Sequence, residues 1–599
     1  MNMPIWQQRF LLPAPYRVFL AARRPERSLL VWNPEGTYQL YAWDRGNNKR
    51  HPLTDVESGQ LFGAISSDGT EIYALVTEDG SERGHVHVMP WEGGEATDIS
   101  PELPPYTCFE IAVAHERTII GFSASFDTEN TLVVVDRNQS SPRLLYTSSQ
   151  QMSDPVFSED GTLVAVTCSL QQKDGEWEVL LLSSEDGKVL YRAAISGGHS
   201  HPIAIDGHGE DARLLVTTNV RGYEEPAWIT RDQEPQFMQD HPTCDHYVLA
   251  YEHKSKQLLC CTVQNAKHSL TLVPEKLPGE LVCEDDGSYD LFFGGGHFLA
   301  NDSILVRHQN SVTPPSLIVF EKKGGESITI LSSPPLPCQP FESMTFRTPD
   351  GASMQAWVAF PKNAEHPLPF VIDVHGGPNG LALNGFSPEA QAWLDHGVGY
   401  CAVNYRGSIS FGKEFEQAIR GKPGTYEVID CVAAKEELVK RGWAQSNAII
   451  LSGWSWGGYI TLLALGKEPQ QWAAGIAAVP IADWIEQYQN EPSYLQAFDQ
   501  ELFGGSPAEV PERYSEASPI TYIEQLKAPI LIIAGEHDSR CPMKQIETYV
   551  SRAESCMKDV RLHLFNAGHT GAFGNAKIGI DAFNAVKKFL HEKKYPLRA

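Results

Sequence analysis

A chain of 599 residues with 42% hydrophobic and 10% aromatic residues exceeds the size of one hydrophobic core and is too apolar to be disordered. Its formal net charge of −27, without a compensating basic patch, argues against nucleic acid and anionic membranes as partners. No stretch reaches the roughly 18 uninterrupted apolar residues of a membrane span, so we expect two or more soluble domains.

The N-terminal part of the chain is predicted to be all-β. Residues 1–15 form a separate segment, for which docking on the C-terminal domain is one arrangement. From 16 to 335, short β-like runs alternate with turn clusters, without a convincing long amphipathic helix. Several turns carry the Asp-Gly pair, a strong hairpin signal, at Asp68-Gly69, Asp160-Gly161 and Asp186-Gly187.

A weak internal repeat favours a β-propeller for this region. Residues 64–74 and 155–165 resemble each other, and their glycines, Gly69 and Gly161, are 92 residues apart. That spacing is about twice the ~40 to 50 residues of a four-stranded blade. At about 45 residues per blade the region holds about seven blades. A large β-sandwich or two smaller β domains are the alternatives.

The pattern changes near residue 340. Residues 336–342 are the predicted linker, because proline density rises between Pro334 and Pro340 and proline cannot continue a central strand. Residues 343–599 then alternate apolar strands with helical patterns, as a parallel sheet covered on both faces requires. The main predicted strands are 369–374, 399–403, 448–451, 474–478, 530–533 and 560–564.

One motif in the α/β region points to nucleophilic catalysis. Gly453-Trp454-Ser455-Trp456-Gly457 lies between the apolar runs 448–451 and 459–465, so it has the form strand, G-x-S-x-G, helix. This form is typical of a nucleophile elbow, a turn so tight that the residues two before and two after the serine lack side chains. An ordinary Gly-rich turn is the alternative.

A serine nucleophile needs a histidine base and an acid that fixes the base. Asp538 follows the strand 530–533, and His569 follows the next strand, 560–564, so both lie where loops at strand carboxyl ends reach an active site. The order Ser455, Asp538, His569 is the one that an α/β-hydrolase requires.

Each member of this triad also has a simpler interpretation. Asp538 could be a turn or helix-capping residue, with Glu536 or His537 as the functional neighbour, and His569 is one of 20 histidines. Three residues in the required order, each at a strand end, favour the triad.

An oxyanion hole is expected beside the elbow. One amide donor would be that of Trp456, directly after the nucleophile, and the other would come from the loop His375-Gly376-Gly377-Pro378. Glycines let this backbone approach a substrate closely, although a simple turn at a strand end would also contain them.

These segments together resemble the prolyl oligopeptidase family of serine peptidases, and its acylaminoacyl-peptidase branch most of all. The matching segments are His375-Gly376-Gly377-Pro378, Asn404-Tyr405-Arg406-Gly407-Ser408, Gly453 to Tyr459, Asp538-Ser539-Arg540-Cys541-Pro542 and Gly568-His569. The resemblance covers residues 343–599. It implies a seven-bladed propeller that caps an α/β-hydrolase domain and restricts the active-site cavity between them to short peptides.

The resemblance also implies roles for individual residues. Ser455, Asp538 and His569 would be the triad, and the amides of Gly377 and Trp456 would form the oxyanion hole. Arg540 would contact a substrate backbone carbonyl; a surface ion pair is the alternative. Trp456 stands where many relatives carry a tyrosine. His375 stands where the dipeptidyl-peptidase branch carries a tyrosine, so a tyrosine hydroxyl donor is not expected in this oxyanion hole.

Two further groups are candidate substrate-binding residues. Trp484, Tyr488 and Phe498 would form the wall of the pocket for the residue before the scissile bond, although each could equally belong to the core. Glu224 and Glu225 invite comparison with acidic residues that bind a free amino terminus; acidic blade loops are the alternative in so negative a chain.

The cysteines and the N-terminus predict a cytoplasmic protein. Eleven cysteines, an odd number with no C-x-x-C pair, indicate reduced thiols and neither a disulfide framework nor a zinc site. The N-terminal segment lacks a basic region before a long apolar stretch, and Pro13 and Pro15 interrupt it, so a signal peptide is not expected.

The predicted function is a serine peptidase that hydrolyses short peptides or removes acylated or unmodified amino-terminal residues through an acyl-enzyme. A specialised amidase or esterase with the same triad is the first alternative, and a propeller binding protein with an idle hydrolase domain is the second. The chemistry requires no cofactor and no metal. A short peptide or peptide-like small molecule is the expected partner, and a homo-oligomer is left open.

Overall fold

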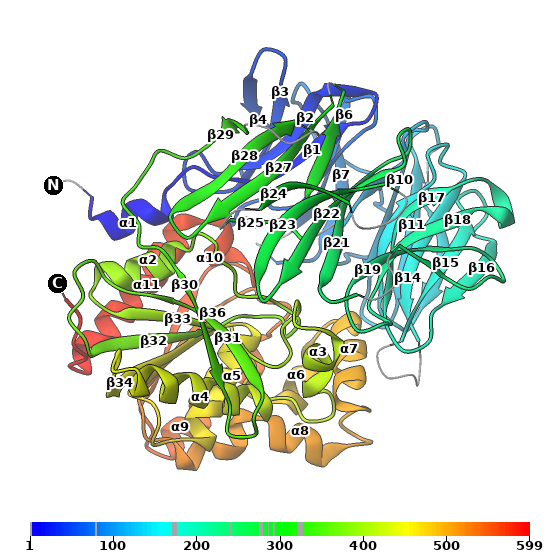
Figure 1. Cartoon of the computed structure of the whole chain (residues 1–599). Coiled ribbons are helices and arrows are strands. Elements are labelled where there is room, and N and C mark those ends of the chain that lie inside the picture. Colours follow the sequence, from blue (N-terminus) through cyan, green and yellow to red (C-terminus); the bar gives the residue numbers. More distant parts are fainter. Residues whose placement is uncertain are drawn as a thin grey trace.

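The computed structural model describes residues 3–77, 81–139, 141–170, 176–238, 242–274, 279–284, 287–291, 294–300, 302–321 and 327–598. Two domains are stacked in it, with the β-rich domain above the α/β domain in Figure 1. The chain passes between them after residue 331 and enters the second domain at residue 342.

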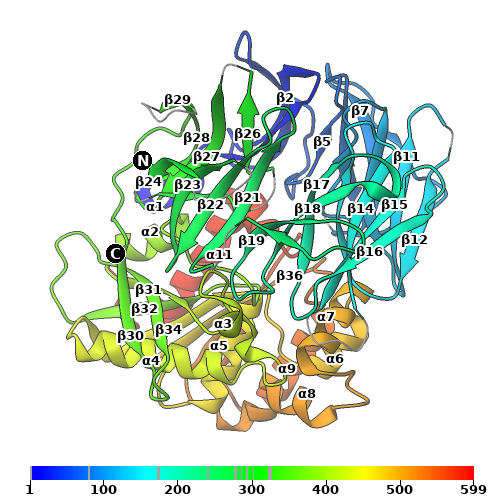
Figure 2. The same ribbon diagram turned by 45° about the vertical axis from the view of Figure 1, so that its right-hand side comes forward.

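The described strands of the first domain form seven antiparallel sheets in a ring (Figures 1 and 2). The first three sheets are β1 (Pro15–Ala21), β2 (Arg24–Trp32), β3 (Gln39–Asp44) and β4 (Lys49–Pro52); β5 (Ala64–Ile65), β6 (Glu71–Thr77), β7 (Gly84–Pro90) and β8 (Thr97–Asp98); and β9 (Ala112–Val113), β10 (Ile119–Ser125), β11 (Asn130–Asp136) and β12 (Arg143–Ser148). Each sheet uses consecutive strands, so each is one blade.

The other four sheets continue the ring. They are β13 (Met152–Phe157), β14 (Leu163–Ser169), β15 (Trp177–Ser183) and β16 (Val189–Ala194); β17 (Ser200–Asp206), β18 (Arg213–Thr218), β19 (Glu225–Ile229) and β20 (Gln236–Phe237); β21 (Asp245–Glu252), β22 (Gln257–Gln264), β23 (Lys267–Val273) and β24 (Glu280–Glu284); and β25 (Ser288–Tyr289), β26 (Gly296–Leu299), β27 (Ser303–Asn310), β28 (Thr313–Glu321) and β29 (Ile328–Leu331). A short 3-10 turn, Gly209–Asp211, precedes β18.

Hydrophobic clusters join each blade to the next and close the ring. One buried cluster lies at each of the six boundaries between consecutive blades. A seventh, which includes Val18, Leu30, Leu305 and Leu317, joins the last blade to the first. Burial of apolar surface on both faces of every sheet stabilises this arrangement. The predicted seven-bladed propeller is therefore confirmed, and a sandwich is excluded.

The second domain is built on one eight-stranded sheet. Its strands are β30 (Glu342–Arg347), β31 (Ser353–Ala359), β32 (Leu368–Val374), β33 (Gly399–Asn404), β34 (Ala444–Trp454), β35 (Ala474–Ala478), β36 (Ile530–Gly535) and β37 (Val560–Phe565). Their order is β30-β31-β33-β32-β34-β35-β36-β37, and the strands from β33 to β37 pair in parallel. This topology confirms the predicted α/β-hydrolase fold.

Helices cover both faces of this sheet, as parallel strands require. They are α2 (Pro388–Asp395), α3 (Lys413–Glu416), α4 (Tyr426–Lys440), α5 (Trp456–Lys467), α6 (Trp484–Asn490), α7 (Ser493–Phe503), α8 (Pro511–Ala517), α9 (Met543–Ser555), α10 (Gly571–Gly574) and α11 (Ala576–Glu592), with 3-10 turns at Gln417–Ile419 and Pro519–Gln525. Two separate hydrophobic clusters fill the space on the two faces.

The N-terminal helix α1 (Ile5–Phe10) packs on the hydrolase domain although it precedes the propeller in sequence (Figure 1). Trp6 belongs to the same hydrophobic cluster as Phe583 of α11, and their ring centroids are 5.3 Å apart. The Arg9 guanidinium pairs with the Asp395 carboxylate of α2 at 2.6 Å. We therefore propose the division of the chain that the sequence predicts, with residues 1–15 as a docked segment.

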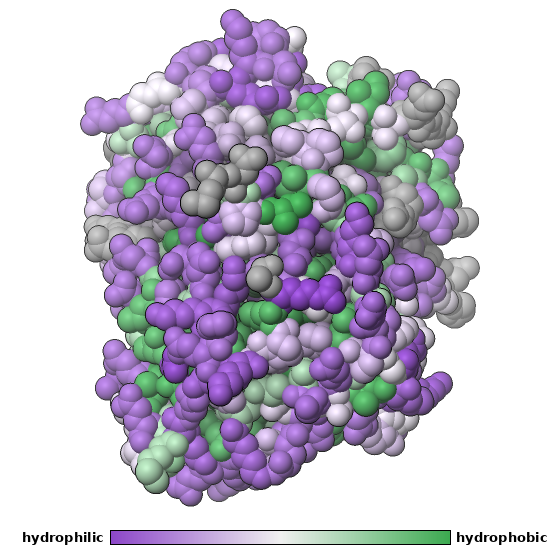
Figure 3. Space-filling view, turned by 90° about the vertical axis from the view of Figure 1, so that its left-hand side faces the viewer, coloured by the Kyte–Doolittle hydropathy of each residue, from purple (hydrophilic) through white to green (hydrophobic). Residues whose placement is uncertain are grey.

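The face of the molecule in Figure 3 is mostly hydrophilic, with hydrophobic side chains scattered over it. Among the helices that the structure describes, none combines the length and the apolar character that a membrane crossing requires.

Candidate active site

Ser455 lies on a strained turn between β34 and α5. Its backbone has φ 57° and ψ −116°, a conformation that residues with a side chain rarely adopt. A Cβ atom at Gly457 would overlap the Val374 carbonyl oxygen of β32, and one at Gly453 would overlap the Gly457 backbone. The close approach of these backbones explains why both positions are glycine and why the serine side chain projects from the turn.

The structure brings the three predicted triad residues together. His569 Nε2 lies 2.9 Å from Ser455 Oγ, and His569 Nδ1 lies 2.8 Å from Asp538 Oδ2. Because a carboxylate only accepts hydrogen bonds, Nδ1–H donates to Asp538 and Nε2 is left to accept from the serine hydroxyl. Asp538 and His569 are 7% and 4% exposed. Little water therefore competes for these hydrogen bonds.

The loop after β36 fixes the Asp538 carboxylate. Asp538 Oδ1 accepts hydrogen bonds from the backbone amides of Arg540 and Cys541, at 2.9 and 2.8 Å. Oδ2 is thereby turned toward His569. The alternative candidates in this loop point elsewhere: Glu536 is exposed, and His537 pairs with Asn566.

The predicted oxyanion loop lies against the elbow. A Cβ atom at Gly376 would contact both the Trp454 carbonyl oxygen, at 3.1 Å, and Ser455 Cβ, at 3.4 Å. Neither the Gly377 amide nor the Trp456 amide has an acceptor among the described residues. Two unpaired donors beside a serine hydroxyl are what the binding of an oxyanion needs.

The segment Asn404 to Ser408 supports this loop, a role that the sequence motif alone did not reveal. The Tyr405 hydroxyl donates to the carbonyl oxygens of His375 and Pro378, at 3.0 and 3.2 Å. The rings of His375 and Tyr405 are stacked at 4.3 Å. Burial lowers the pKa of His375 to about 4, so its imidazole is neutral near pH 7. His375 therefore holds the loop without adding a charge.

Arg540 connects the acid loop to the propeller. Its Nε lies 2.6 Å from the Glu82 carboxylate, and its guanidinium lies 4.8 Å from the Phe109 ring centre. Glu82 lies between β6 and β7, and Phe109 precedes β9. The arginine side chain is thus engaged in an interdomain ion pair, and its contact with a substrate carbonyl stays a prediction.

The predicted aromatic wall is only partly open. Trp484 is 1% exposed, and its ring packs against those of Trp456 and Tyr459 at 5.6 and 5.2 Å. Tyr488 and Phe498 are partly buried against the same cluster. Trp484 therefore lies in the core behind Trp456, while a substrate-binding role for Tyr488 and Phe498 stays a prediction.

The structure does not present Glu224 and Glu225 as a pair. Glu225 is fully buried and forms an ion pair with Arg221 at 2.5 Å. Glu224, which precedes β19, forms an ion pair with His199. Burial lowers the pKa of His199, but the Glu224 carboxylate outweighs this and raises it to about 9, so the imidazole is charged. Of the two glutamates, Glu224 lines the central cavity.

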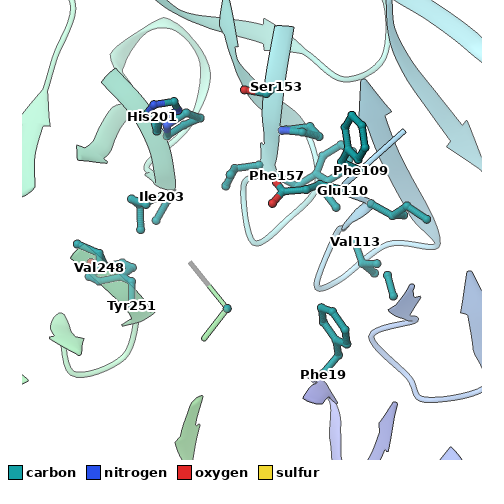
Figure 4. A pocket seen from close by; sticks show the side chains of 18 of the residues that line it. Phe19, Phe109, Glu110, Val113, Ser153, Phe157, His201, Ile203, Val248 and Tyr251 are labelled. Atoms are coloured by element: carbon teal, nitrogen blue, oxygen red, sulfur yellow. The ribbon is translucent and has the colours of Figure 1, made fainter. Parts of the chain in front are cut away.

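Two neighbouring cavities lie where the domains meet. The larger, of about 690 Å³, runs along the propeller axis and reaches Asn379, Ile409 and Glu416 of the hydrolase domain. Figure 4 shows side chains from several blades around it, among them Phe19 and Ile203. The smaller, of about 70 Å³, is lined by Glu82 and by both neighbours of His569. Phe62, Leu75, Cys108 and Phe109 line both cavities.

One group of potential metal ligands occurs among the described residues. The ligand atoms of Asp538, Cys541 and His569 lie within 4.8 Å of one another. Burial and the nearby Asp538 carboxylate raise the pKa of the Cys541 thiol well above its usual value. A neutral thiol is a poor metal ligand, and the mutual hydrogen bond of Asp538 and His569 accounts for their proximity.

The hydrolase region matches a known family. Residues 384–594 match the family model described as the prolyl oligopeptidase family. The chain is 30% identical over 243 residues to dipeptidyl peptidase family member 6 of Caenorhabditis elegans. This alignment covers 40% of this chain and 32% of that protein. It is 28% identical over 211 residues to the acylamino-acid-releasing enzyme of Arabidopsis thaliana, with 33% of this chain and 27% of that protein covered.

The match to these curated relatives is partial, whereas the structural match is complete. The aligned part spans about a third of the length of the curated relatives. The whole chain has the fold of a puromycin-hydrolyzing peptidase of Mycobacterium tuberculosis, with a TM-score of 0.81 at 18% identity, over 99% of this chain and 95% of that chain. Residues 384–594 therefore match the prolyl oligopeptidase family model, and they lie within the two-domain fold of a seven-bladed propeller and an α/β-hydrolase.

Proposed function

We propose that the protein is a serine peptidase that hydrolyses short peptides, or removes acylated or unmodified amino-terminal residues, through an acyl-enzyme. The observation that carries the proposal is the continuous hydrogen-bond chain from Ser455 through His569 to Asp538. The family match and the relatives named as acylamino-acid-releasing and dipeptidyl-peptidase proteins support a peptidase.

The geometry supplies each step of acyl transfer. His569 Nε2 takes the Ser455 proton as the hydroxyl oxygen attacks the scissile carbonyl carbon. The amides of Trp456 and Gly377 donate to the oxyanion of the tetrahedral intermediate. His569 then gives the proton to the leaving amine, which leaves an ester on Ser455, and water repeats the sequence to release the acid. Asp538 holds the imidazole and stabilises its cation.

The propeller restricts what reaches Ser455. The cavity is bounded by propeller strands on one side and by the hydrolase on the other, so an extended or folded polypeptide does not fit a space of about 690 Å³. We infer that substrates are short peptides or molecules of similar size.

The experiment is labelling and hydrolysis by the full-length chain. A fluorophosphonate should label the wild type on Ser455 and leave Ser455→Ala unlabelled, and the variant should lose hydrolysis of short peptide anilides by about 10⁴-fold or more. Unchanged hydrolysis in Ser455→Ala would overturn the proposal. A panel with aryl esters and amides would reveal an esterase or amidase if the peptides alone were not cleaved.

A further inference from the structure

The central cavity carries an acidic group that the mechanism above does not use. Glu416 ends helix α3 and is among the hydrolase residues that line the cavity. Asn379, which directly follows Gly377 and Pro378 of the oxyanion loop, lines the same cavity. The cavity that Glu416 lines therefore reaches the residue that follows the oxyanion loop.

The position of Glu416 is fixed by the backbone. The Lys413 amide at the start of α3 donates to the Gly222 carbonyl oxygen of the propeller at 2.8 Å, and the Glu416 amide donates to the Gly412 carbonyl oxygen at 3.1 Å. Helix α3 thus lies directly beneath the loop that also carries Glu224, and Figure 2 shows it on the propeller side of the hydrolase domain. The backbone of Glu416 is thereby held at the domain boundary.

The Glu416 carboxylate has no hydrogen bond or ion pair with any residue that the structure describes, whereas the charged groups around it are paired. Arg420 pairs with Glu501 at 2.7 Å, and His199 pairs with Glu224. A partly buried carboxylate in a cavity wall interacts favourably with a cation that enters the cavity, because it has no competing partner there among the described residues.

The charge of the cavity wall also favours a cationic ligand. Four glutamates line the cavity, Glu110, Glu159, Glu224 and Glu416, against one arginine, Arg17. The charges of His199 and Glu224 cancel in their ion pair, which leaves Glu110, Glu159 and Glu416 against Arg17. Low-dielectric walls strengthen the remaining negative potential within the cavity.

We propose that Glu416 is a specificity-determining residue that binds a primary ammonium group of the substrate. The ammonium group is either the free amino terminus of a short peptide or the side chain of a lysine residue, and the two share this chemistry. The inference rests on the proposed peptidase function and deepens it, since it predicts that cationic substrates are preferred over neutral acylated ones. The subsite comes from the hydrolase domain and not from the Glu224–Glu225 segment.

The test compares three matched peptide anilides that differ only in the position of an ammonium group. One has a free amino terminus and neutral side chains, the second is its N-acetyl derivative, and the third is an N-acetyl peptide that contains lysine. The enzymes are the wild type, Glu416→Gln, Glu416→Asp and the matched control Glu414→Gln. Glu414 is an exposed carboxylate on the same helix and does not line the cavity.

In the wild type, kcat/KM should be higher for a cationic substrate than for the neutral one. Glu416→Gln should lower kcat/KM for that cationic substrate by about 10- to 100-fold, the value of a charge-assisted hydrogen bond. The kcat/KM for the neutral substrate should stay the same. Glu416→Asp should retain part of the preference, and Glu414→Gln should retain all of it. The cationic substrate that responds, amino-terminal or lysine, identifies the source of the ammonium group.

Equal loss for all three substrates in Glu416→Gln, or no loss for any of them, would overturn the inference. A second readout is the dissociation constant of the same peptides for Ser455→Ala, with and without Glu416→Gln, since binding there does not require catalysis. Failure of the proposed function is distinguishable: the wild type would then cleave none of the three peptides and would not react with the fluorophosphonate.

Discussion

The Arg540 guanidinium and the Glu82 carboxylate form an ion pair of 2.6 Å that links the loop of the catalytic acid candidate to the second propeller blade. The two residues are 458 positions apart in sequence. The Arg540 backbone amide also donates to Asp538 Oδ1, so one residue contacts both the propeller and the carboxylate that orients His569.

This ion pair should contribute to the association of the two domains. We expect a double-mutant cycle of Glu82→Gln and Arg540→Gln in urea-induced unfolding to give a coupling energy of about 1 kcal/mol, because both side chains are only partly buried. The exposed pair Arg552–Glu524 is a suitable control and should give less. Strictly additive effects of the two substitutions would show that the pair does not couple the domains.

Asp538→Asn should lower kcat by about 10⁴-fold with little change in KM. Asparagine can donate to His569 Nδ1 and thereby hold the tautomer that cannot accept the serine proton. Glu536→Gln serves as the control, because Glu536 is exposed in the same loop and was the alternative acid. Steady-state kinetics on a peptide anilide measure both; a comparable loss in the two variants would contradict the assignment.

Tyr405→Phe should lower kcat by about tenfold, since the hydroxyl that holds the His375 and Pro378 carbonyl oxygens is lost and the oxyanion loop is less well fixed. We expect a loss of stability of about 1 kcal/mol from the same hydrogen bonds. Tyr522→Phe removes an exposed hydroxyl bond to the Glu516 carbonyl oxygen and should leave kcat unchanged. An unaltered kcat in Tyr405→Phe would remove the supporting role of this residue.

A buried carboxyl pair between α6 and α7 should make stability depend on pH. Glu491 and Asp499 each carry an oxygen without a hydrogen-bond partner among the described residues. Burial raises the pKa of Glu491 to about 7, and burial together with the Glu491 charge raises the pKa of Asp499 well above its usual value. Gln487 donates to both Glu491 and the Arg540 carbonyl oxygen, so the pair lies beside the acid loop.

The direction in which stability changes with pH follows from proton binding. Between the unfolded glutamate pKa of about 4.3 and the folded value of about 7, the folded chain binds more protons than the unfolded chain, so stability falls as pH rises through this window. Glu491→Gln should therefore unfold with a weaker pH dependence than the wild type, and it should be the more stable of the two at pH 8 by about 1 to 3 kcal/mol. Parallel curves of melting temperature against pH from 5 to 8 would contradict this.

The amino-acid sequence determined the elements whose signal is local. Gly453 to Gly457 predicted a tight turn between a strand and a helix, and Asp538 and His569 each lie in the loop that follows a parallel strand. The carboxyl ends of parallel strands meet at one edge of a sheet, so the order of these residues along the chain was enough to place them together. The Asp-Gly turns likewise predicted hairpins; Gly69 and Gly161 have φ of 70° and 68°.

Only the tertiary structure decided which side chains far apart in sequence meet. Glu225 is buried against Arg221 and not presented to the cavity, Arg540 reaches Glu82, and Tyr405 supports the His375 loop. Glu416 carried no sequence signal, because a glutamate in a short helix is ordinarily a solvated surface residue. Its significance arises from the docking of the propeller on α3, which places the carboxylate in the cavity wall without a partner among the described residues, and that contact exists only when both domains are folded together.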